Sequence, residues 1–541
     1  MIRKAPSVIA TGTLTGGQAV VKALRAEGVD TIFGIPGTHI LAIYDALIDE
    51  PGIRRILPRH EQGAAFMADG YARATGRPGV IIITGGPGLS NAATGISEAY
   101  VDSSPLLVIS SQVRSEHAGL ERGHLHEMKD QAGFMQSITG WHARAAQVAE
   151  IPALLHEAMR RLKSDRPRPM HIEILDASGE VSLLAPEEYP RPTGDPQAIA
   201  QAADLLRAAQ RPMIYAGGGI ATSGAECELL RLAQLLDAPV MTSIMGKGAI
   251  PADHPLSLVG SRRLSGPARS IVESSDLVLA VGTKLGAMAT EDWTLPLSQN
   301  LIHVDIDESV IGRSYPTRLG IVGDAKMVLQ QLIAALQEDP GQRPSRAQEV
   351  AEAVRRHLAH GWINTPEQMR ILTDLRRALD RDAIVVWDMT LVGYASTSYF
   401  HVYGTRTYLY PWTSGTLGFA VPAAIGAKIG RPEQQVVALC GDGGFLFTGE
   451  EVVAAVQHDV HAIFVVLNDR CYSAVKNMHT RRYGRCVDVE LSPVDYVKLA
   501  EAYGARAMRA EQDALGKALR EALDLPGPVL IEVPFSHQHA W

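Results

Sequence analysis

Short apolar runs alternate with amphipathic segments along most of this chain. The clearest runs are Val80–Ile83, Leu106–Ile109, Val436–Leu439 and Ala462–Leu467, each with four to six consecutive apolar residues. Uninterrupted runs of this length are typical of strands buried on both faces of a parallel sheet. Between the runs, apolar residues recur at helical spacing, as from Gly16 to Glu27. The alternation predicts an α/β protein built from doubly wound parallel sheets.

Three such units are expected, spanning residues 1–185, 195–337 and 365–541. A proline-rich linker, 185–192, separates the first two, and a polar connector with some helix, 338–360, separates the last two. The predicted strands lie, in order, within 31–35, 55–58, 80–83, 106–109, 212–219, 276–282, 300–307, 383–387, 436–439, 462–467 and 528–533. The first and third units look like two versions of one architecture.

Composition and charge exclude several classes of function. The 541 residues carry a formal net charge of −8 and no long basic run, so nucleic acid and anionic membranes are poor candidate partners. The four cysteines have neither CxxC nor zinc-site spacing and are expected to be reduced thiols. No apolar run reaches the length of a membrane span, and the N-terminus lacks a signal-peptide core. A cytoplasmic protein is expected.

The strongest chemical signal follows the apolar run Val436–Leu439. The chain turns through Gly441-Asp442-Gly443-Gly444 into a helical segment, and the next predicted strand ends at Asn468. A strand–turn–helix–strand unit of this kind holds a phosphate where the turn meets the helix. Asp442 and Asn468 supply two hard oxygen ligands at neighbouring strand ends, which suits Mg²⁺ on a diphosphate. The alternative is an ordinary glycine turn with an N-capping Asp.

Gly-Asp-Gly with an Asn 26 residues after the Asp resembles the signature of thiamine diphosphate (ThDP) enzymes. The resemblance implies that Asp442, Asn468 and the backbone carbonyl of Arg470 bind Mg²⁺. Members of that family more often have Asn-Asn or Asn-Asn-Gly where this chain has Asn468-Asp469-Arg470, but a main-chain ligand tolerates the change. The resemblance also implies that the following residues contact the cofactor: Thr390, Gly441, Asp442, Gly443, Gly444, Asn468, Tyr472 and Ser473.

A second segment, Arg59-His60-Glu61-Gln62-Gly63-Ala64, resembles the pyrimidine-domain motif of the same family. The resemblance implies that Glu61, at the end of a predicted strand, stabilises the imino tautomer of the cofactor, whose 4′-nitrogen removes the C2 proton. The alternative is a Glu favoured by a helix dipole. Because Glu61 and Asp442 lie in different units, the resemblance also implies a cofactor shared between subunits. A homodimer is then the smallest active form, and a homotetramer is the expected assembly.

Further parts of the site are implied by the same resemblance. Ser414–Ala424 looks like the segment under the cofactor, with the Gly415 carbonyl at the 4′-amino group and Leu417 as the apolar wedge between the rings. The loops containing Pro36, His39, Pro87 and Asn91 match those facing the thiazolium. His39 would bind the substrate carboxylate or carry a proton. The competing interpretations are a glycine-rich helix start at Gly415 and a helix-capping His39.

The loop Gly123–Gln131 sits where acetolactate synthases carry Phe-Gln-Glu, with Glu127 at the Gln position. A carboxylate in the pocket fits a cationic substrate such as a guanidinium. In this respect the chain resembles 5-guanidino-2-oxopentanoate decarboxylases more than acetolactate synthases. The alternative is a solvated charged loop.

The resemblance therefore implies an enzyme acting on 2-oxo acids through a C2 carbanion and an enamine. Protonation of that intermediate makes the enzyme a decarboxylase, and capture by a second carbonyl makes it an acetolactate synthase-like carboligase. His39 and Glu127 favour decarboxylation, whereas Gly246–Gly248 and Asp305–Asp307, which also occur in flavin-binding relatives, favour carboligation. Gly217–Gly219 could contact a dinucleotide, but a lone glycine-rich strand end is weak evidence, and FAD is not favoured. Two alternatives of other classes are an inactive regulatory or scaffold homologue and, on those glycines alone, an NAD-dependent oxidoreductase.

Overall fold

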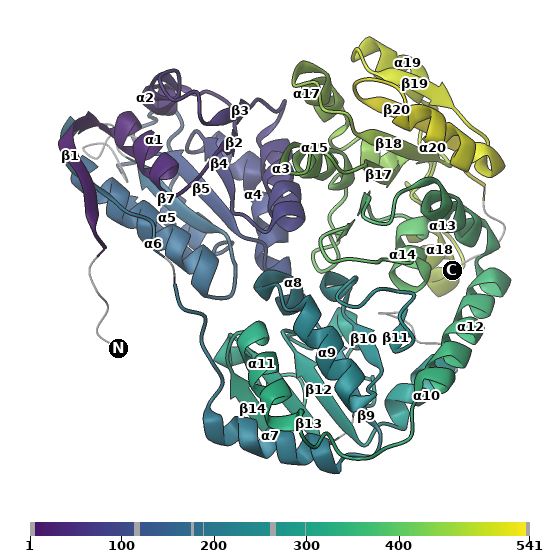
Figure 1. The fold of residues 1–541 in the computed structure, drawn as a ribbon. Coiled ribbons are helices and arrows are strands. Elements are labelled where there is room, and N and C mark those ends of the chain that lie inside the picture. Colours follow the sequence, from purple (N-terminus) through teal and green to yellow (C-terminus); the bar gives the residue numbers. More distant parts are fainter. Residues whose placement is uncertain are drawn as a thin grey trace.

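The computed structural model describes residues 6–112, 120–174, 178–187, 189–259, 267–297 and 299–536. Three α/β units follow one another, each around a six-stranded parallel sheet, which confirms the predicted fold class. Figure 1 shows the N-terminal unit in purple to blue, the central unit in teal and the C-terminal unit in green to yellow. Within the described residues, no helix is both long and apolar enough to cross a membrane.

The N-terminal sheet has the strand order β3-β2-β4-β5-β7-β6. Its strands are β2 (Thr31–Phe33), β3 (Arg54–Ile56), β4 (Gly79–Ile83), β5 (Leu106–Ser111), β6 (Trp141–Ala145) and β7 (Met170–Ile174). β2 is shorter than predicted, since the chain soon reaches Pro36, which has no N–H to extend the ladder. β6 and β7 were not predicted from the sequence. In β7, His171 and Glu173 interrupt the apolar pattern, although both side chains are fully buried. A separate antiparallel pair joins β1 (Val8–Thr15) to β8 (Ser178–Leu184).

The C-terminal sheet repeats this topology. Its order is β16-β15-β17-β18-β20-β19. When the strands of each sheet are numbered in chain order, both the C-terminal and the N-terminal sheet have the order 2-1-3-4-6-5. The strands are β15 (Ile384–Trp387), β16 (Tyr408–Leu409), β17 (Val436–Gly441), β18 (Ile463–Asn468), β19 (Arg506–Arg509) and β20 (Val529–Pro534). The two terminal units therefore share one architecture, as their sequences predict.

The central sheet has a different order, β11-β10-β9-β12-β13-β14, or 3-2-1-4-5-6 within the sheet. Its strands are β9 (Pro212–Ala216), β10 (Val240–Thr242), β11 (Ser257–Leu258), β12 (Leu277–Val281), β13 (Leu301–Asp305) and β14 (Leu319–Val322). This is the order of dinucleotide-binding folds. The connector predicted as mainly polar contains one long helix, α12 (Ala347–Asn364), because Val350 and Ala353 are buried against the central unit.

Helices α3 (Glu61–Thr75) and α15 (Ala420–Gly430) pack together and join the two terminal units into one hydrophobic core, as Figure 1 shows. Glycines allow the close approach. A Cβ on Gly70 would lie 2.0 Å from the carbonyl oxygen of Ala423, and one on Gly426 would lie 1.8 Å from that of Met67. Residues without side chains at these two points therefore bring the backbones into contact.

Candidate active site

Doubly wound sheets bind ligands at the carboxyl ends of their strands, where the strand order reverses. In the N-terminal sheet this point lies between β2 and β4, which lead into the segments with His39 and Pro87. In the C-terminal sheet it lies between β15 and β17, which lead into Thr390 and Asp442. The predicted site residues thus gather at two equivalent positions, one in each terminal unit.

Glu61 does not end a strand, so that prediction is wrong. β3 ends at Ile56, and Glu61 is the first residue of α3, where a negative charge is favoured by the helix dipole. The N–H of Gln62 donates to Nδ1 of His60, the N-cap, at 3.1 Å. Oε2 of Glu61 accepts a hydrogen bond from Nδ2 of Asn91 at 3.0 Å. Two predicted site residues on α3 and α4 (Pro87–Asp102) therefore meet.

Two imidazole rings lie beside this carboxylate. The ring centroids of His39 and His126 are 5.1 Å apart in an edge-on arrangement. Nδ1 of His126 lies 3.2 Å from Oγ1 of Thr84. A Cβ on Gly88 would be 3.0 Å from the Thr84 methyl and 3.6 Å from Oε1 of Glu61, so one side chain separates the imidazoles from the carboxylate. Desolvation, and then His126, lowers the pKa of His39, so its ring is neutral at neutral pH.

Glu127 holds its own loop. Its carboxylate accepts the backbone N–H groups of Arg122, Gly123 and His124 at 3.3, 2.7 and 3.0 Å. Desolvation raises the pKa of Glu127, but these N–H groups outweigh it and hold the pKa below its usual value. The side chain is half-buried and already carries three hydrogen bonds. A contact with substrate would have to use the remaining lone-pair directions.

The predicted metal ligands lie at adjacent strand ends. Asp442 opens the short helix α16 (Asp442–Phe445) directly after β17, and Asn468 is the last residue of β18, which pairs with β17. Burial, and then Asp469, raises the pKa of Asp442 to about 6. Nδ2 of Asn468 donates to Oε1 of Glu532 at 2.7 Å, which leaves its oxygen for another partner. The carbonyl of Arg470 accepts the N–H of Leu491 at 2.8 Å and keeps one lone pair.

The glycines after β17 form a cradle with little room above their backbone. A Cβ on Gly443 would lie 2.5 Å from the Tyr472 ring, and one on Gly444 would lie 3.2 Å from Oδ2 of Asp388. A Cβ on Gly441 would meet the Thr390 methyl at 3.5 Å. The N–H of Gly443 donates to Oδ1 of Asp442 at 2.9 Å. A backbone without side chains in such a cradle suits a diphosphate, and the oxygen donors beside it suit Mg²⁺. The residues therefore fit the predicted group.

The remaining predicted contacts have structural partners of their own. Oγ of Ser473 donates to Oδ2 of Asp469 at 2.5 Å. Oγ1 of Thr390 caps α14 (Leu391–Tyr399). Gly415 has a positive φ of +69°, as its position in a tight turn requires, and Leu417 next to it is half-buried. The segment is fixed by Asp388, whose buried carboxylate accepts the N–H of Gly418 at 3.0 Å.

The cavity beside Asn468 does not reach the residues around Glu61. This cavity of about 990 Å³ contains Asn468 and Arg470 but neither Glu61 nor His39. Among the described residues, no hydrogen bond or ion pair joins Glu61 or Asn91 to Asp442 or Asn468. One chain therefore presents two half-sites, defined here as the pyrimidine half-site around Glu61 and the diphosphate half-site around Asp442.

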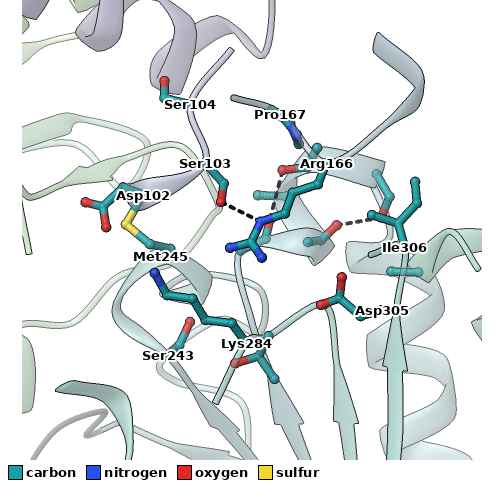
Figure 2. A pocket seen from close by; sticks show the side chains of 18 of the residues that line it. Asp102, Ser103, Ser104, Arg166, Pro167, Ser243, Met245, Lys284, Asp305 and Ile306 are labelled. Carbon is teal, nitrogen blue, oxygen red and sulfur yellow. Dashed lines mark hydrogen bonds between the residues drawn. The ribbon is translucent and has the colours of Figure 1, made fainter. Parts of the chain in front are cut away.

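A separate cavity of about 400 Å³ lies where the three units meet. Figure 2 shows Asp102 and Ser103 from the N-terminal unit facing Lys284 and Asp305 from the central unit across it. Arg166 donates from Nε to Oγ of Ser103 at 2.9 Å. The cavity also contains these residues of the glycine-rich and lysine segments: Gly218, Gly219, Lys247 and Gly282.

This cavity lies at the ends of β9 and β12, the point where the order of the central sheet reverses. Nucleotides bind there in related folds. Lys247, however, is buried, and its Nζ donates to the carbonyls of Val259 at 3.3 Å and Thr397 at 3.0 Å. It joins the central and C-terminal units and offers no free ammonium to a ligand.

Sequence analysis missed three residues that shape the half-sites: His126, Glu451 and Glu532. His126 lies one residue before the predicted Glu127, and a His-Leu-His pattern was the available signal. Glu532 lies in the predicted final strand, where a buried carboxylate needs a partner. Glu451 lies nine residues after Asp442, and no local pattern reveals that it contacts the N-terminal unit.

Comparisons with known proteins agree across the whole chain. Family models match residues 14–134 (thiamine pyrophosphate enzyme, N-terminal TPP binding domain), 199–332 (central domain) and 388–533 (C-terminal TPP binding domain). A Pseudomonas aeruginosa protein named "Probable 2-ketoarginine decarboxylase AruI" is 39% identical over 540 residues, covering 96% of this chain and 94% of that protein. A "Probable acetolactate synthase large subunit" of Methanocaldococcus jannaschii is 35% identical, covering 96% and 92%. The "Acetolactate synthase isozyme 3 large subunit" of Escherichia coli is 33% identical, covering 94% and 92%.

Proposed function

This chain belongs to the thiamine pyrophosphate enzyme family, and we propose that it is a ThDP- and Mg²⁺-dependent decarboxylase of a 2-oxo acid. The observation that supports the reaction class best is the pair of half-sites at equivalent switch points. One carries a carboxylate held by an amide, and the other carries oxygen donors beside a glycine cradle. A cytoplasmic location and the three domain boundaries given above remain part of the proposal.

In this proposal each residue has a defined task. Asp442, Asn468 and the Arg470 carbonyl hold Mg²⁺, and the glycines at 441, 443 and 444 let the diphosphate approach the backbone. When bound, thiamine diphosphate supplies the electron sink that allows the substrate carboxylate to leave as CO₂. Glu61, oriented by Asn91, presents its carboxylate to the aminopyrimidine.

The substrate carbon that loses CO₂ must gain a proton before an aldehyde can leave. The balanced reaction is R–CO–COO⁻ + H⁺ → R–CHO + CO₂. His39 is the proposed proton carrier or carboxylate partner, because it is the partly desolvated imidazole beside the Glu61 pocket. An imidazole can take up the H⁺ that the reaction consumes and deliver it to this carbon as imidazolium, which returns the ring to its neutral form.

The proposed substrate is a 2-oxo acid other than pyruvate, with a guanidino acid as the first candidate. Support comes from the similarity to the protein named 2-ketoarginine decarboxylase. Carboligation is the second candidate, because two similar proteins are named acetolactate synthase and because the central cavity resembles a nucleotide site. FAD is not part of the first proposal.

Product analysis separates the two candidates. The purified protein with ThDP and Mg²⁺ would be given 5-guanidino-2-oxopentanoate, pyruvate and a branched 2-oxo acid, and aldehydes and 2-hydroxy ketones would be separated. We expect CO₂ and an aldehyde from the guanidino acid. A 2-hydroxy ketone as the main product, with a flavin absorbance band in the purified protein, would replace this proposal with the carboligase.

We further propose that the active site forms between two copies of the chain, with a homotetramer as the full assembly. The separation of the half-sites supports this, and so does the exposure of Leu446 and Phe447 (47% and 49%) beside the diphosphate half-site. Co-expression of Glu61→Gln and Asp442→Asn chains tests it. Each variant alone is expected to be inactive, whereas each mixed dimer regains one intact site of its two. A randomly assembled population, in which about half of the dimers are mixed, then has about one quarter of the wild-type sites. No recovery in isolated mixed dimers would contradict a shared site.

A further inference from the structure

The loop that leads into Glu61 obtains its hydrogen bonds from the other end of the chain. The N–H of Leu57 donates to Nε2 of His458 at 2.9 Å. The N–H of Arg59 donates to both carboxylate oxygens of Glu451 at 3.0 Å, and that of His60 donates to Oε1 of Glu451 at 2.9 Å. Residue 58 is a proline and has no N–H. All backbone N–H groups between the end of β3 at Ile56 and Glu61 therefore donate to side chains of the C-terminal unit.

Glu451 is the central partner in this contact. It is fully buried, at the end of the short helix η6 (Gly449–Glu451). A Cβ on Gly63 would lie only 2.0 Å from Oε1 of Glu451, so the carboxylate rests directly on the first turn of α3. The N–H groups of Arg59 and His60 and the positive end of the helix dipole favour a negative charge on Glu451, whereas burial opposes it.

The same carboxylate is rigidly connected to the diphosphate half-site. Successive turns link it back to Asp442, with the N–H of Leu446 on the Asp442 carbonyl at 3.3 Å and the N–H of Glu451 on the Thr448 carbonyl at 3.1 Å. Oγ1 of Thr448 also donates to the carbonyl of Gly418 at 2.6 Å, next to the segment with Leu417. Nine residues of hydrogen-bonded turns thus join the metal ligand to the residue that holds the Glu61 loop.

We propose that Glu451 is a positioning residue for Glu61 and that it couples the two half-sites of one chain. This inference rests on the proposed function. Because those half-sites serve different active sites of the proposed dimer, occupancy of the diphosphate half-site in one active site alters the Glu61 geometry in the other. The physical basis is one buried carboxylate contacting two backbone donors on a loop with no sheet partners of its own.

The environment of Glu451 is suited to such a link. Burial raises the pKa of Glu451 to about 8, with a smaller contribution from Glu450, while the N–H groups of Arg59 and His60 and the Arg59 charge oppose it. A buried carboxyl group with so high a pKa changes its charge in response to small changes in its surroundings. A surface carboxylate would be insensitive to them.

The positioning role is tested by the exchange of the cofactor C2 proton with D₂O, followed by NMR after acid quench. This readout needs bound ThDP and Glu61 but no substrate. In Glu451→Gln an amide N–H₂ faces the N–H of Arg59, and we expect exchange and kcat to fall about 10- to 100-fold with KM unchanged. Glu450→Gln is the matched control, because its carboxylate has no hydrogen bond to this loop among the described residues, and it should behave as wild type.

A second variant covers the case in which Glu451→Gln does not fold. Gly63→Ala keeps every charge but pushes the carboxylate away from the loop, and it should slow exchange in the same direction. Wild-type exchange rates in both variants would overturn the positioning role, as would an equal loss in Glu450→Gln. If the wild-type protein itself did not accelerate exchange, the proposed function would fail instead.

Coupling has its own test in ThDP titrations of the intact oligomer, followed by calorimetry at saturating Mg²⁺. We expect two unequal binding steps per wild-type dimer and a single step in Glu451→Gln. Two identical, independent sites in the wild-type protein would overturn the coupling. Unequal steps that persist unchanged in Glu451→Gln would mean that another contact couples the sites, and would overturn the coupling role of Glu451.

Discussion

Arg73 lies where all three units meet, and its replacement should destabilise the chain strongly. Its guanidinium bonds to Asp69 at 2.8 Å through both Nε and Nη2, to Asp102 at 3.3 Å and to Glu98 at 3.4 Å. It also donates to the carbonyl of Tyr410 in the C-terminal unit at 3.1 Å. Burial disfavours the guanidinium charge, but the surrounding carboxyl groups outweigh it and raise the pKa of Arg73. Burial, and then Asp102, raises the pKa of Glu98 well above its usual value.

Arg73→Met would leave this carboxyl cluster buried without its cation. Removing one partner of a buried ion pair costs about 3–5 kcal/mol, because the remaining charge is uncompensated. The matched control is Arg77→Met. Arg77 pairs with Asp30 at the surface, where the side chains are 48% and 41% exposed, and such pairs contribute about 0–1 kcal/mol.

Urea unfolding followed by tryptophan fluorescence provides the assay. With an m-value of about 3 kcal/mol/M, Arg73→Met should lower the midpoint by roughly 1–1.7 M, and Arg77→Met by less than about 0.3 M. Equal midpoints for the two variants would refute the reasoning. That result would mean that the cluster sheds its charge by protonation at little cost and that Arg73 does not hold the junction.

Three further predictions concern the site and its surroundings. Glu61→Gln should lower kcat by about 10²- to 10⁴-fold, yet leave ThDP affinity in calorimetry within a few-fold, because only the carboxylate charge is lost; unchanged kcat would contradict its role. Glu532→Leu should weaken Mg²⁺ binding about 10- to 100-fold, because Asn468 loses the acceptor that orients its amide; a wild-type Mg²⁺ titration would dismiss that role. Burial lowers the pKa of Lys247 to about 7. Between pH 7 and 10.5 the Lys247 side chain is therefore protonated only in the unfolded chain, so the free energy of unfolding rises with pH by up to roughly 1.4 kcal/mol per unit. Lys247→Met should flatten this rise in urea midpoints measured at pH 6.5 and 9.5, and parallel profiles would refute it.

The sequence was sufficient to place those candidate site residues whose positions depend on local pattern. Asp442 and Asn468 follow apolar runs that are typical of buried strands. Parallel strands end at the same edge of a sheet, so the proximity of the two residues follows from this pattern. Glu61 was found through its motif, although the motif placed it at a strand end rather than at the start of α3. The substrate contact of Glu127 stays a prediction, and the hydrogen bonds that Glu127 makes depend on how its loop folds back.

The sequence by itself determined the three α/β units, the repeated architecture of the first and third, and the chemistry available at their strand ends. These follow from apolar periodicity and glycine turns, which act over a few residues. Only the tertiary structure decided that Glu451 bonds to a loop nearly 400 residues earlier, that His126 faces His39, and that Arg73 sits among carboxyl groups from two helices. Such contacts depend on how helices from distant segments pack, and in particular on the glycines that let α3 and α15 touch, so no local stretch of the chain contains them.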